Sequence, residues 1–124
     1  MSLLLAFLLQ NAVLTERRID DFPQAVYPYT GLYVACLDIE MTTLARRPDT
    51  VEEAKAAYRA AVDVCRGVRE IASDQADRAL SNHAEFKDAT KRGDVISKAF
   101  AIADQACNLC GSIARSSKAK QERN

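Results

Sequence analysis

The chain has 124 residues, of which 48% are hydrophobic and 27% are charged. This length fits one domain with its own core, and the apolar fraction is too high for an intrinsically disordered chain. Because 17 Lys and Arg residues balance 17 Asp and Glu residues, the formal net charge is zero. The chain therefore lacks the overall basic character of nucleic-acid-binding proteins, and no nucleic-acid partner is expected.

An apolar run, Leu3–Leu9, lies at the start of the chain. It is too short to cross a bilayer, which takes about 20 residues, so no stable membrane span is expected. Its length matches the hydrophobic region of a secretory signal peptide, although no Lys or Arg precedes it and residues 10–12 form a poor cleavage site. Its leucines also recur at helical spacing. We therefore expect residues 1–14 to be either a cleaved leader or an N-terminal helix.

The next segment, residues 15–30, interrupts the helical pattern because Pro23 and Pro28 each restrict the residue before them. We predict an irregular connector here, or the mature N-terminus if the leader is removed. A helix is then predicted from Gly31 to Arg46. Its core-facing stripe is expected to comprise Leu32, Cys36, Ile39 and Thr43.

The clearest helix start follows a short turn around Pro48. The sequence from Thr50 to Glu53 is typical of a capping box, in which the Thr50 hydroxyl accepts from the N–H of Glu53 and the Glu53 carboxylate returns to the N–H of Thr50. We predict one helix from Val51 to about Asn82, with Gly67 marking a close helix approach. Its core-facing stripe is expected to comprise Val51, Ala54, Tyr58, Ala61, Cys65, Val68, Ala72, Ala76 and Ala79.

A last helix is predicted to begin with Asp94 as its N-cap, after Gly93, and to run through Cys107 and Cys110 to about Ser116. Residues 117–124 are polar and basic, which indicates a flexible tail. Strand signals are nearly absent. The predicted fold is therefore all-α, an antiparallel bundle of three long helices within a single domain of residues 15–116, with residues 1–14 as a possible fourth helix.

Four cysteines bear on the compartment. Cys36 and Cys65 lie on core-facing stripes at similar depth on either side of the turn at Pro48, so we predict a disulfide between them. The alternative is two buried free thiols. Cys107 and Cys110 are a possible second pair. Disulfides favour a periplasmic or secreted protein, with the cytoplasm as the alternative.

The Cys107–Cys110 pair is also a CxxC motif. Such a motif is redox-active when its first thiol lies exposed at a helix N-terminus, whereas here about three turns of predicted helix precede it. The interpretation we favour is therefore two small core residues, or one disulfide partner with a spare thiol. The single histidine, His83, and the cysteine spacing fit no zinc site, so we expect no metal and no cofactor.

No group of residues indicates a catalytic site. Asp74 and Asp77 lie at i, i+3 spacing, but Arg78, four residues after Asp74, indicates ordinary surface pairing. The sequence contains no nucleophile triad and no phosphate-binding glycine loop, so we expect that the protein is not an enzyme. The leading hypothesis is a small non-enzymatic binding or structural module, exported and disulfide-clipped, that recognises a protein partner. The alternatives are a thiol-dependent redox protein using Cys107 and Cys110, and an intracellular helical adaptor with free thiols.

Overall fold

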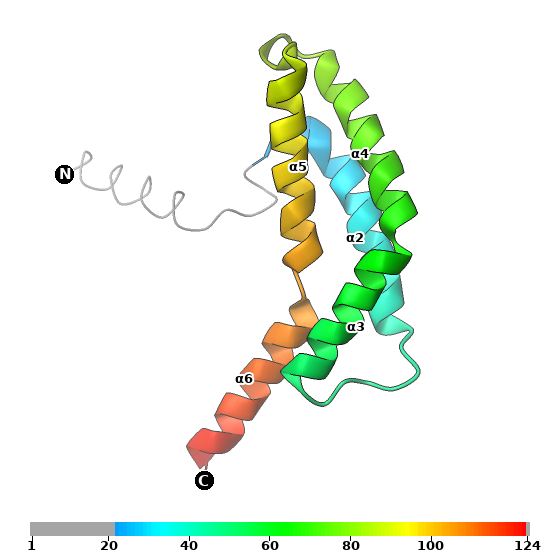
Figure 1. Cartoon of the computed structure of the whole chain (residues 1–124). Coiled ribbons are helices and arrows are strands. Elements are labelled where there is room, and N and C mark those ends of the chain that lie inside the picture. Colours follow the sequence, from blue (N-terminus) through cyan, green and yellow to red (C-terminus); the bar gives the residue numbers. More distant parts are fainter. Residues whose placement is uncertain (1–21, 124) are drawn as a thin grey trace, which may run out of the picture.

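The structure, a computed structural model, describes residues 22–123. Over this range the chain forms five α-helices and two short 3-10 helices, with no strand, which confirms the all-α class (Figure 1). The elements are η2 (Gln24–Val26), α2 (Tyr27–Thr42), α3 (Val51–Val64), α4 (Arg66–Ser81), η3 (Ala84–Phe86), α5 (Ala89–Gln105) and α6 (Asn108–Arg123). The leader or helix expected at residues 1–14 lies outside the described residues.

The helices follow three passes of alternating direction along the molecule (Figure 1). Helix α2 makes the first pass, α3 and α4 together make the return, and α5 and α6 make the third. The strongest packing joins α4 to both α2 and α5, while α3 packs on α2 and α6. The prediction of three long helices is wrong in number, because the second and third predicted helices are each broken into two.

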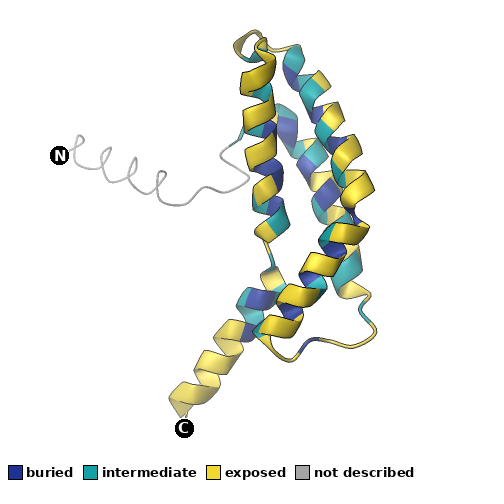
Figure 2. Ribbon diagram, in the orientation of Figure 1, coloured by how far each residue is buried: buried dark blue, intermediate teal, exposed yellow. Residues whose placement is uncertain are grey.

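The main core lies between α2, α4 and α5, with residues from α3 at one end. Its fully buried large side chains are Tyr33, Phe100, Leu37, Leu80 and Val26. A smaller cluster, comprising Ala54, Cys110 and Ile113, joins α3 to α6. Beyond Ile113 every described residue of α6 is exposed (Figure 2). The expected helix end near Ser116 is wrong, since α6 continues to Arg123.

Helix α2 begins four residues earlier than predicted. Pro28 is its second residue, and proline is tolerated in the first turn because the N–H groups there have no intrahelical acceptor. The segment before it is not irregular throughout, since Gln24–Val26 forms a turn of 3-10 helix whose Val26 is fully buried. The expectation that Pro28 lies in an irregular connector is therefore wrong.

The long helix predicted after Val51 is interrupted at one residue, Cys65, whose φ of −86° and ψ of 7° depart from helical values. Its N–H still donates to the carbonyl of Ala61 and its carbonyl accepts from Arg69, so the chain bends there and continues. Gly67, a weak helix former, follows the bend. A Cβ at Gly67 would meet nothing within 4 Å, so the predicted close helix approach is wrong.

The start predicted at Asp94 is also wrong. Helix α5 begins at Ala89, and its N-cap is Asp88, whose Oδ1 accepts from the N–H of Thr90 at 2.9 Å. Gly93 and Asp94 lie inside this helix, and Gly93 has no positive φ that would end a preceding helix. The short polar side chain of Asp88 satisfies an N–H in the first turn, which explains the earlier start.

Candidate functional site

An apolar groove of about 330 Å³ runs between α2 and α4. Its large apolar lining residues are solvent-exposed: Leu32 by 54%, Ile39 by 59%, Val68 by 39% and Ile71 by 62%. The remaining lining residues are Ala35, Cys36, Glu40, Ala72 and Gln75. We call this surface the α2–α4 groove.

The exposure of Leu32 and Ile39 corrects the predicted core-facing stripe of α2. The stripe that faces the core instead contains Thr30, Tyr33 and Leu37, which are all at most 1% exposed. Thr30 is accommodated there because its hydroxyl donates to backbone carbonyls of the preceding turn. The apolar side chains that sequence periodicity assigned to the core therefore form an exposed surface.

Cys36 and Cys65 lie at disulfide distance, with their Cα atoms 6.1 Å apart. Cys65 is fully buried in the main core, whereas Cys36 is half-buried and also lines the α2–α4 groove. The pair connects α2 to the bend between α3 and α4. It thus fixes Cys36, which lines the groove, against the bend where the second pass changes direction.

A polar network joins three helices beside the core. The Asp104 carboxylate on α5 accepts from Nε and Nη2 of Arg69 on α4 at 3.0 and 2.8 Å. The same carboxylate accepts from the buried Tyr33 hydroxyl on α2 at 2.5 Å. The Arg69 guanidinium also lies 5.6 Å from the ring centroid of Phe100 and 5.8 Å from that of Tyr33. These contacts fix the relative positions of α2, α4 and α5.

The network favours fixed protonation states. Burial raises the pKa of Tyr58 to about 12, with the nearby Asp104 carboxylate adding to the shift. Burial and then the hydrogen bond to Asp104 raise the pKa of Tyr33, and the hydrogen bond to Asp104 raises the pKa of Arg69. The two phenols therefore stay neutral and the guanidinium stays charged near neutral pH. A general acid or base must exchange its proton near the working pH, so this network is suited to structure.

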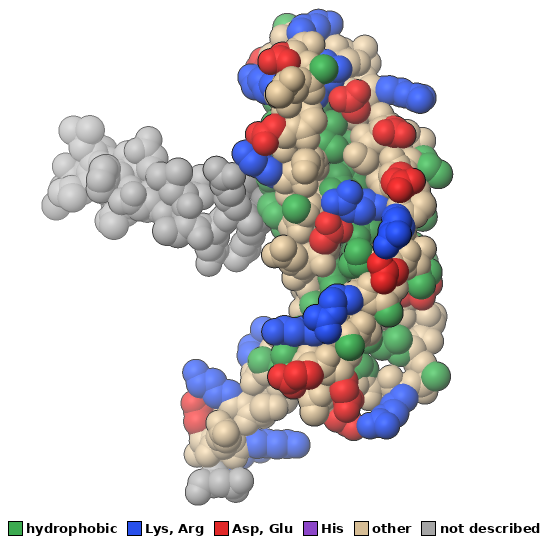
Figure 3. All heavy atoms as spheres, viewed as in Figure 1, with side chains coloured by type: hydrophobic (Ala, Val, Ile, Leu, Met, Phe, Trp, Pro, Cys, Tyr) green, Lys and Arg blue, Asp and Glu red, His purple; other side chains and the backbone are tan. Residues whose placement is uncertain are grey.

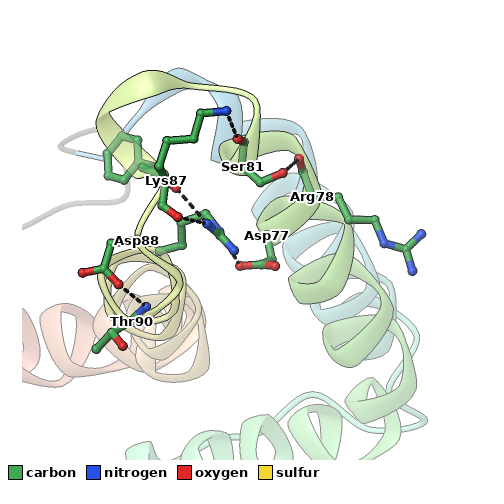
Figure 4. A network of polar contacts seen from close by, with 8 residues as sticks. Asp77, Arg78, Ser81, Lys87, Asp88 and Thr90 are labelled. Carbon is green, nitrogen blue, oxygen red and sulfur yellow. Dashed lines mark hydrogen bonds and ion pairs between the residues drawn. The ribbon is translucent and has the colours of Figure 1, made fainter.

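The turn between α4 and α5 holds a second polar cluster (Figure 4). Arg92, whose side chain is 14% exposed, donates to Asp77 at 3.0 Å and to the carbonyls of Phe86 and Lys87 at 2.9 Å each. Lys87 in turn donates to the carbonyl of Ser81. These bonds close the turn and satisfy its backbone carbonyls.

A polar cavity of about 530 Å³ lies below this turn, between α4 and α5. Two of its charged lining residues, Arg69 and Asp77, are in ion pairs with Asp104 and Arg92 respectively. Because these two charges are already paired across the helices, we assign Arg69 and Asp77 to the packing of α4 on α5.

The Cys107–Cys110 pair lies at a helix start, not inside a helix as predicted. Helix α5 ends at Gln105, and α6 begins at Asn108. Of the two residues between, Ala106 and Cys107, Ala106 has a ψ of 61°, which is far from the helical value. The two sulfurs are at disulfide distance, with Cα atoms 5.3 Å apart.

The other residues considered from the sequence do not form a functional site in the described part of the chain. His83 is exposed at the N-cap of η3, and within residues 22–123 no three His, Cys, Asp or Glu side chains are grouped so as to hold a metal ion. Acidic and basic side chains are interspersed over the face seen in Figure 3. None of the helices described is both long and apolar enough to span a bilayer.

Comparison with known proteins finds no matching family model, no matching curated protein and no matching solved structure. The α2–α4 groove and the Cys107–Cys110 pair are therefore the two features from which a function is inferred. Sequence reasoning singled out the second and missed the first.

Proposed function

We propose that the protein is a small, exported binding module that recognises an amphipathic helix of a protein partner through the α2–α4 groove. The observation that carries this proposal is the distribution of exposed large hydrophobic side chains. Of the five such residues in the described range, four line this groove, and the fifth, Val64, precedes Val68 by about one turn. Contiguous exposed apolar surface on a small soluble domain is typical of an interaction site, whereas single exposed apolar residues are not.

The geometry of the groove favours a helix as its occupant. Leu32 and Ile39 are seven residues apart on α2, and Val68 and Ile71 are three apart on α4, so each helix offers an apolar row along its length. Two helices side by side with apolar rows can receive a third, whose own row then packs between them. The single charged lining residue is Glu40, which favours a Lys or Arg beside the apolar row of the partner.

Export is the second part of the proposal. It is supported by the pairing of all four cysteines at disulfide distance, because disulfides persist mainly in oxidising compartments. We therefore place the protein in the periplasm or outside the cell. Fractionation of the native host, with mass spectrometry of blocked thiols and of the N-terminus, tests this part. Four free thiols on a cytoplasmic chain that retains Met1 or Ser2 would support an intracellular adaptor instead.

The binding part is tested with a photo-crosslinking amino acid placed at Gln75 in the groove and, as the matched control, at the exposed Lys98 on α5. The protein is expressed in its native host and the crosslinked peptide is sequenced. We expect one foreign protein, joined at Gln75 and absent at Lys98, through a segment with an apolar helical row. Because Ile71 is 62% exposed, Ile71→Glu should remove the crosslink and leave the melting temperature unchanged.

Three outcomes overturn the proposed partner. A crosslink between two copies of this chain makes the groove a dimer interface, and a crosslink to residues 1–21 makes it an intramolecular contact. Equal crosslinking from Gln75 and Lys98 shows that the groove has no specific occupant.

A further inference from the structure

We infer that Cys107 and Cys110 form a site of thiol–disulfide exchange, in which their disulfide oxidises a dithiol. This inference does not depend on the groove or on its partner. It concerns a different end of the molecule, where α6 begins beside the last turn of α5.

The first observation is the position of Cys107 at the start of α6. Its carbonyl accepts the first helical hydrogen bond, from Gly111, and its Sγ accepts from the N–H of Cys110 at 3.2 Å. Cys107 therefore occupies the N-cap position, and its sulfur bonds to the third helical residue as a serine or threonine oxygen does at other caps. A thiolate at this position is stabilised over a thiol by that N–H and by the positive end of the helix dipole.

The second observation is the surroundings of the pair. A cavity of about 260 Å³ reaches both cysteines and is lined by Lys55, Tyr58, Arg59, Asp104 and Gln105. Lys55 and Arg59 are the exposed cations contributed by α3, while the Asp104 carboxylate is already bonded to Arg69 and Tyr33. The Tyr58 hydroxyl donates to the carbonyl of Ala103. The charge left available to a developing thiolate is therefore mainly positive.

The third observation is unequal access to the two sulfur-bearing residues. Cys107 is half-buried, whereas Cys110 is 8% exposed and packs with Ala54 and Ile113. An incoming thiolate thus reaches Cys107 first, and Cys110 is held inside as the leaving and resolving group. The Cys36–Cys65 pair also has one half-buried cysteine, Cys36, but its partner Cys65 is fully buried in the main core.

The loop closed by the pair argues against a purely structural role. The two cysteines are three residues apart, whereas Cys36 and Cys65 are 29 apart. Closing a very short loop removes little conformational freedom from the unfolded chain, so this disulfide stabilises the fold less than the Cys36–Cys65 disulfide does. The packing of Cys110 on Ala54 and Ile113 does not require the bond.

The exchange proceeds in two balanced steps. A thiolate of the substrate dithiol attacks Cys107 Sγ, a bond forms between these two sulfurs, and the Cys107–Cys110 bond breaks with Cys110 leaving as a thiolate that takes up a proton. The second substrate thiol then loses its proton and attacks the first substrate sulfur. The mixed disulfide breaks, and Cys107 leaves as a thiolate at the N-terminus of α6. Two electrons pass to the protein, the substrate dithiol becomes a disulfide, and a further turnover requires reoxidation.

The test follows both cysteine pairs of the oxidised full chain during reaction with two dithiols. One is dithiothreitol, and the other is an unstructured synthetic peptide containing two cysteines. Free thiols are alkylated at intervals and located by mass spectrometry. We expect Cys107 and Cys110 to be reduced at least about tenfold faster than Cys36 and Cys65, because thiolate stability at the start of α6 favours them. Reaction with the peptide identifies a polypeptide dithiol as an accepted substrate, and reaction with dithiothreitol alone identifies a small dithiol.

Two sets of variants assign the roles. Cys110→Ser should trap a stable mixed disulfide at Cys107 with oxidised glutathione, while Cys107→Ser should leave Cys110 largely unmodified. Arg59→Gln should slow the exchange by about two- to fivefold at low salt, the effect of one partly screened charge, and Arg78→Gln at the far end of α4 should not.

Equal reduction rates for the two pairs, or equal trapping at Cys107 and Cys110, overturn the inference. The rates are measured on the wild-type chain, so the comparison remains decisive even if Cys110→Ser fails to fold. The readout is the position of reduced thiols, which is separate from crosslinking at the groove.

Discussion

The Cys36–Cys65 pair allows a quantitative test of what holds the second pass of the chain against the first. The two residues are 29 apart in sequence. In the chain-entropy account, a disulfide closing such a loop stabilises the fold by about 3.6 kcal/mol, against about 2 kcal/mol for the short loop between Cys107 and Cys110. For a domain whose total stability is about 5–15 kcal/mol, the larger value is a substantial fraction of the whole.

The measurement uses two double variants. In Cys107→Ala/Cys110→Ala only the long loop remains closed, and in Cys36→Ala/Cys65→Ala only the short one. Each protein is unfolded in urea at 25 °C, before and after complete reduction, with helical circular dichroism as the signal. Comparing the oxidised and reduced forms of one variant keeps its side chains unchanged, which matters because Cys65 is fully buried. We expect reduction to remove about 3.6 kcal/mol from the first variant and about 2 kcal/mol from the second. If the first variant is equally stable in both forms, Cys36 and Cys65 are not bridged.

Three other predictions concern the polar network and a helix cap. Asp104→Ala should lower the free energy of unfolding in urea by about 3 kcal/mol, because it leaves a buried phenol and a partly buried guanidinium without their acceptor. The control Asp94→Ala, which removes an exposed ion pair, should lower it by less than about 1 kcal/mol. Equal losses for the two variants would contradict the role given to Asp104. Tyr33 and Tyr58 have folded-state pKa values above the ordinary value of 10.0. The free energy of unfolding that the two neutral phenols contribute is therefore complete below pH 10 and is lost as the pH rises toward about 12. The loss should reach about 1.4 kcal/mol per pH unit for each phenol. In urea unfolding at alkaline pH, Tyr58→Phe should reduce the slope of the free energy of unfolding against pH. An unchanged slope would contradict the role given to Tyr58. Thr50→Ala should lower the free energy of unfolding by about 1 kcal/mol, measured in the same way. An unchanged free energy of unfolding would show that the cap is not needed.

The first turn of α3 shows how far local chemistry can be predicted from sequence. Thr50 is the N-cap, and its hydroxyl accepts from the N–H of Glu53 at 3.1 Å, which confirms that half of the predicted capping box. The other half is wrong by one residue, because the Glu53 carboxylate accepts from the N–H of Asp49. The choice between adjacent N–H groups depends on the path of the preceding turn, which the capping pattern does not specify.

The core stripe of residues 51–80 was also predictable, because apolar residues there recur on one side of the helix. Ala54, Tyr58, Ala61, Ala72 and Ala76 are buried as expected, although Val68 is not. In α2 the same method fails for a physical reason. Apolar side chains lie on several sides of that helix, so periodicity alone does not distinguish the side facing the core from the side forming the groove. Only the packing of α4 and α5 on α2 makes the distinction.

The break between α5 and α6 has the largest consequence for function. The apolar spacing through Ile96, Phe100 and Ala103 continues to Cys110, so the sequence predicts one helix and gives no proline or cap signal for a break. The break accompanies a tertiary contact, because Cys110 and Ile113 pack on Ala54 of α3. Helix α6 therefore takes a different direction from α5 (Figure 1).

That change of direction alters the chemistry available to an unchanged motif. Inside a continuous helix the N–H of Cys110 would donate to a backbone carbonyl one turn earlier, and no positive helix end would lie near Cys107. In the observed arrangement this N–H donates to Cys107 Sγ instead, and Lys55 and Arg59 of α3 line the same cavity. The contact between α3 and α6 is therefore what gives the Cys107–Cys110 pair the features of an exchange site. It follows that a substitution that weakens this contact, such as Ala54→Glu, should reduce the reactivity of Cys107 more than it reduces the helicity of α2, α4 and α5.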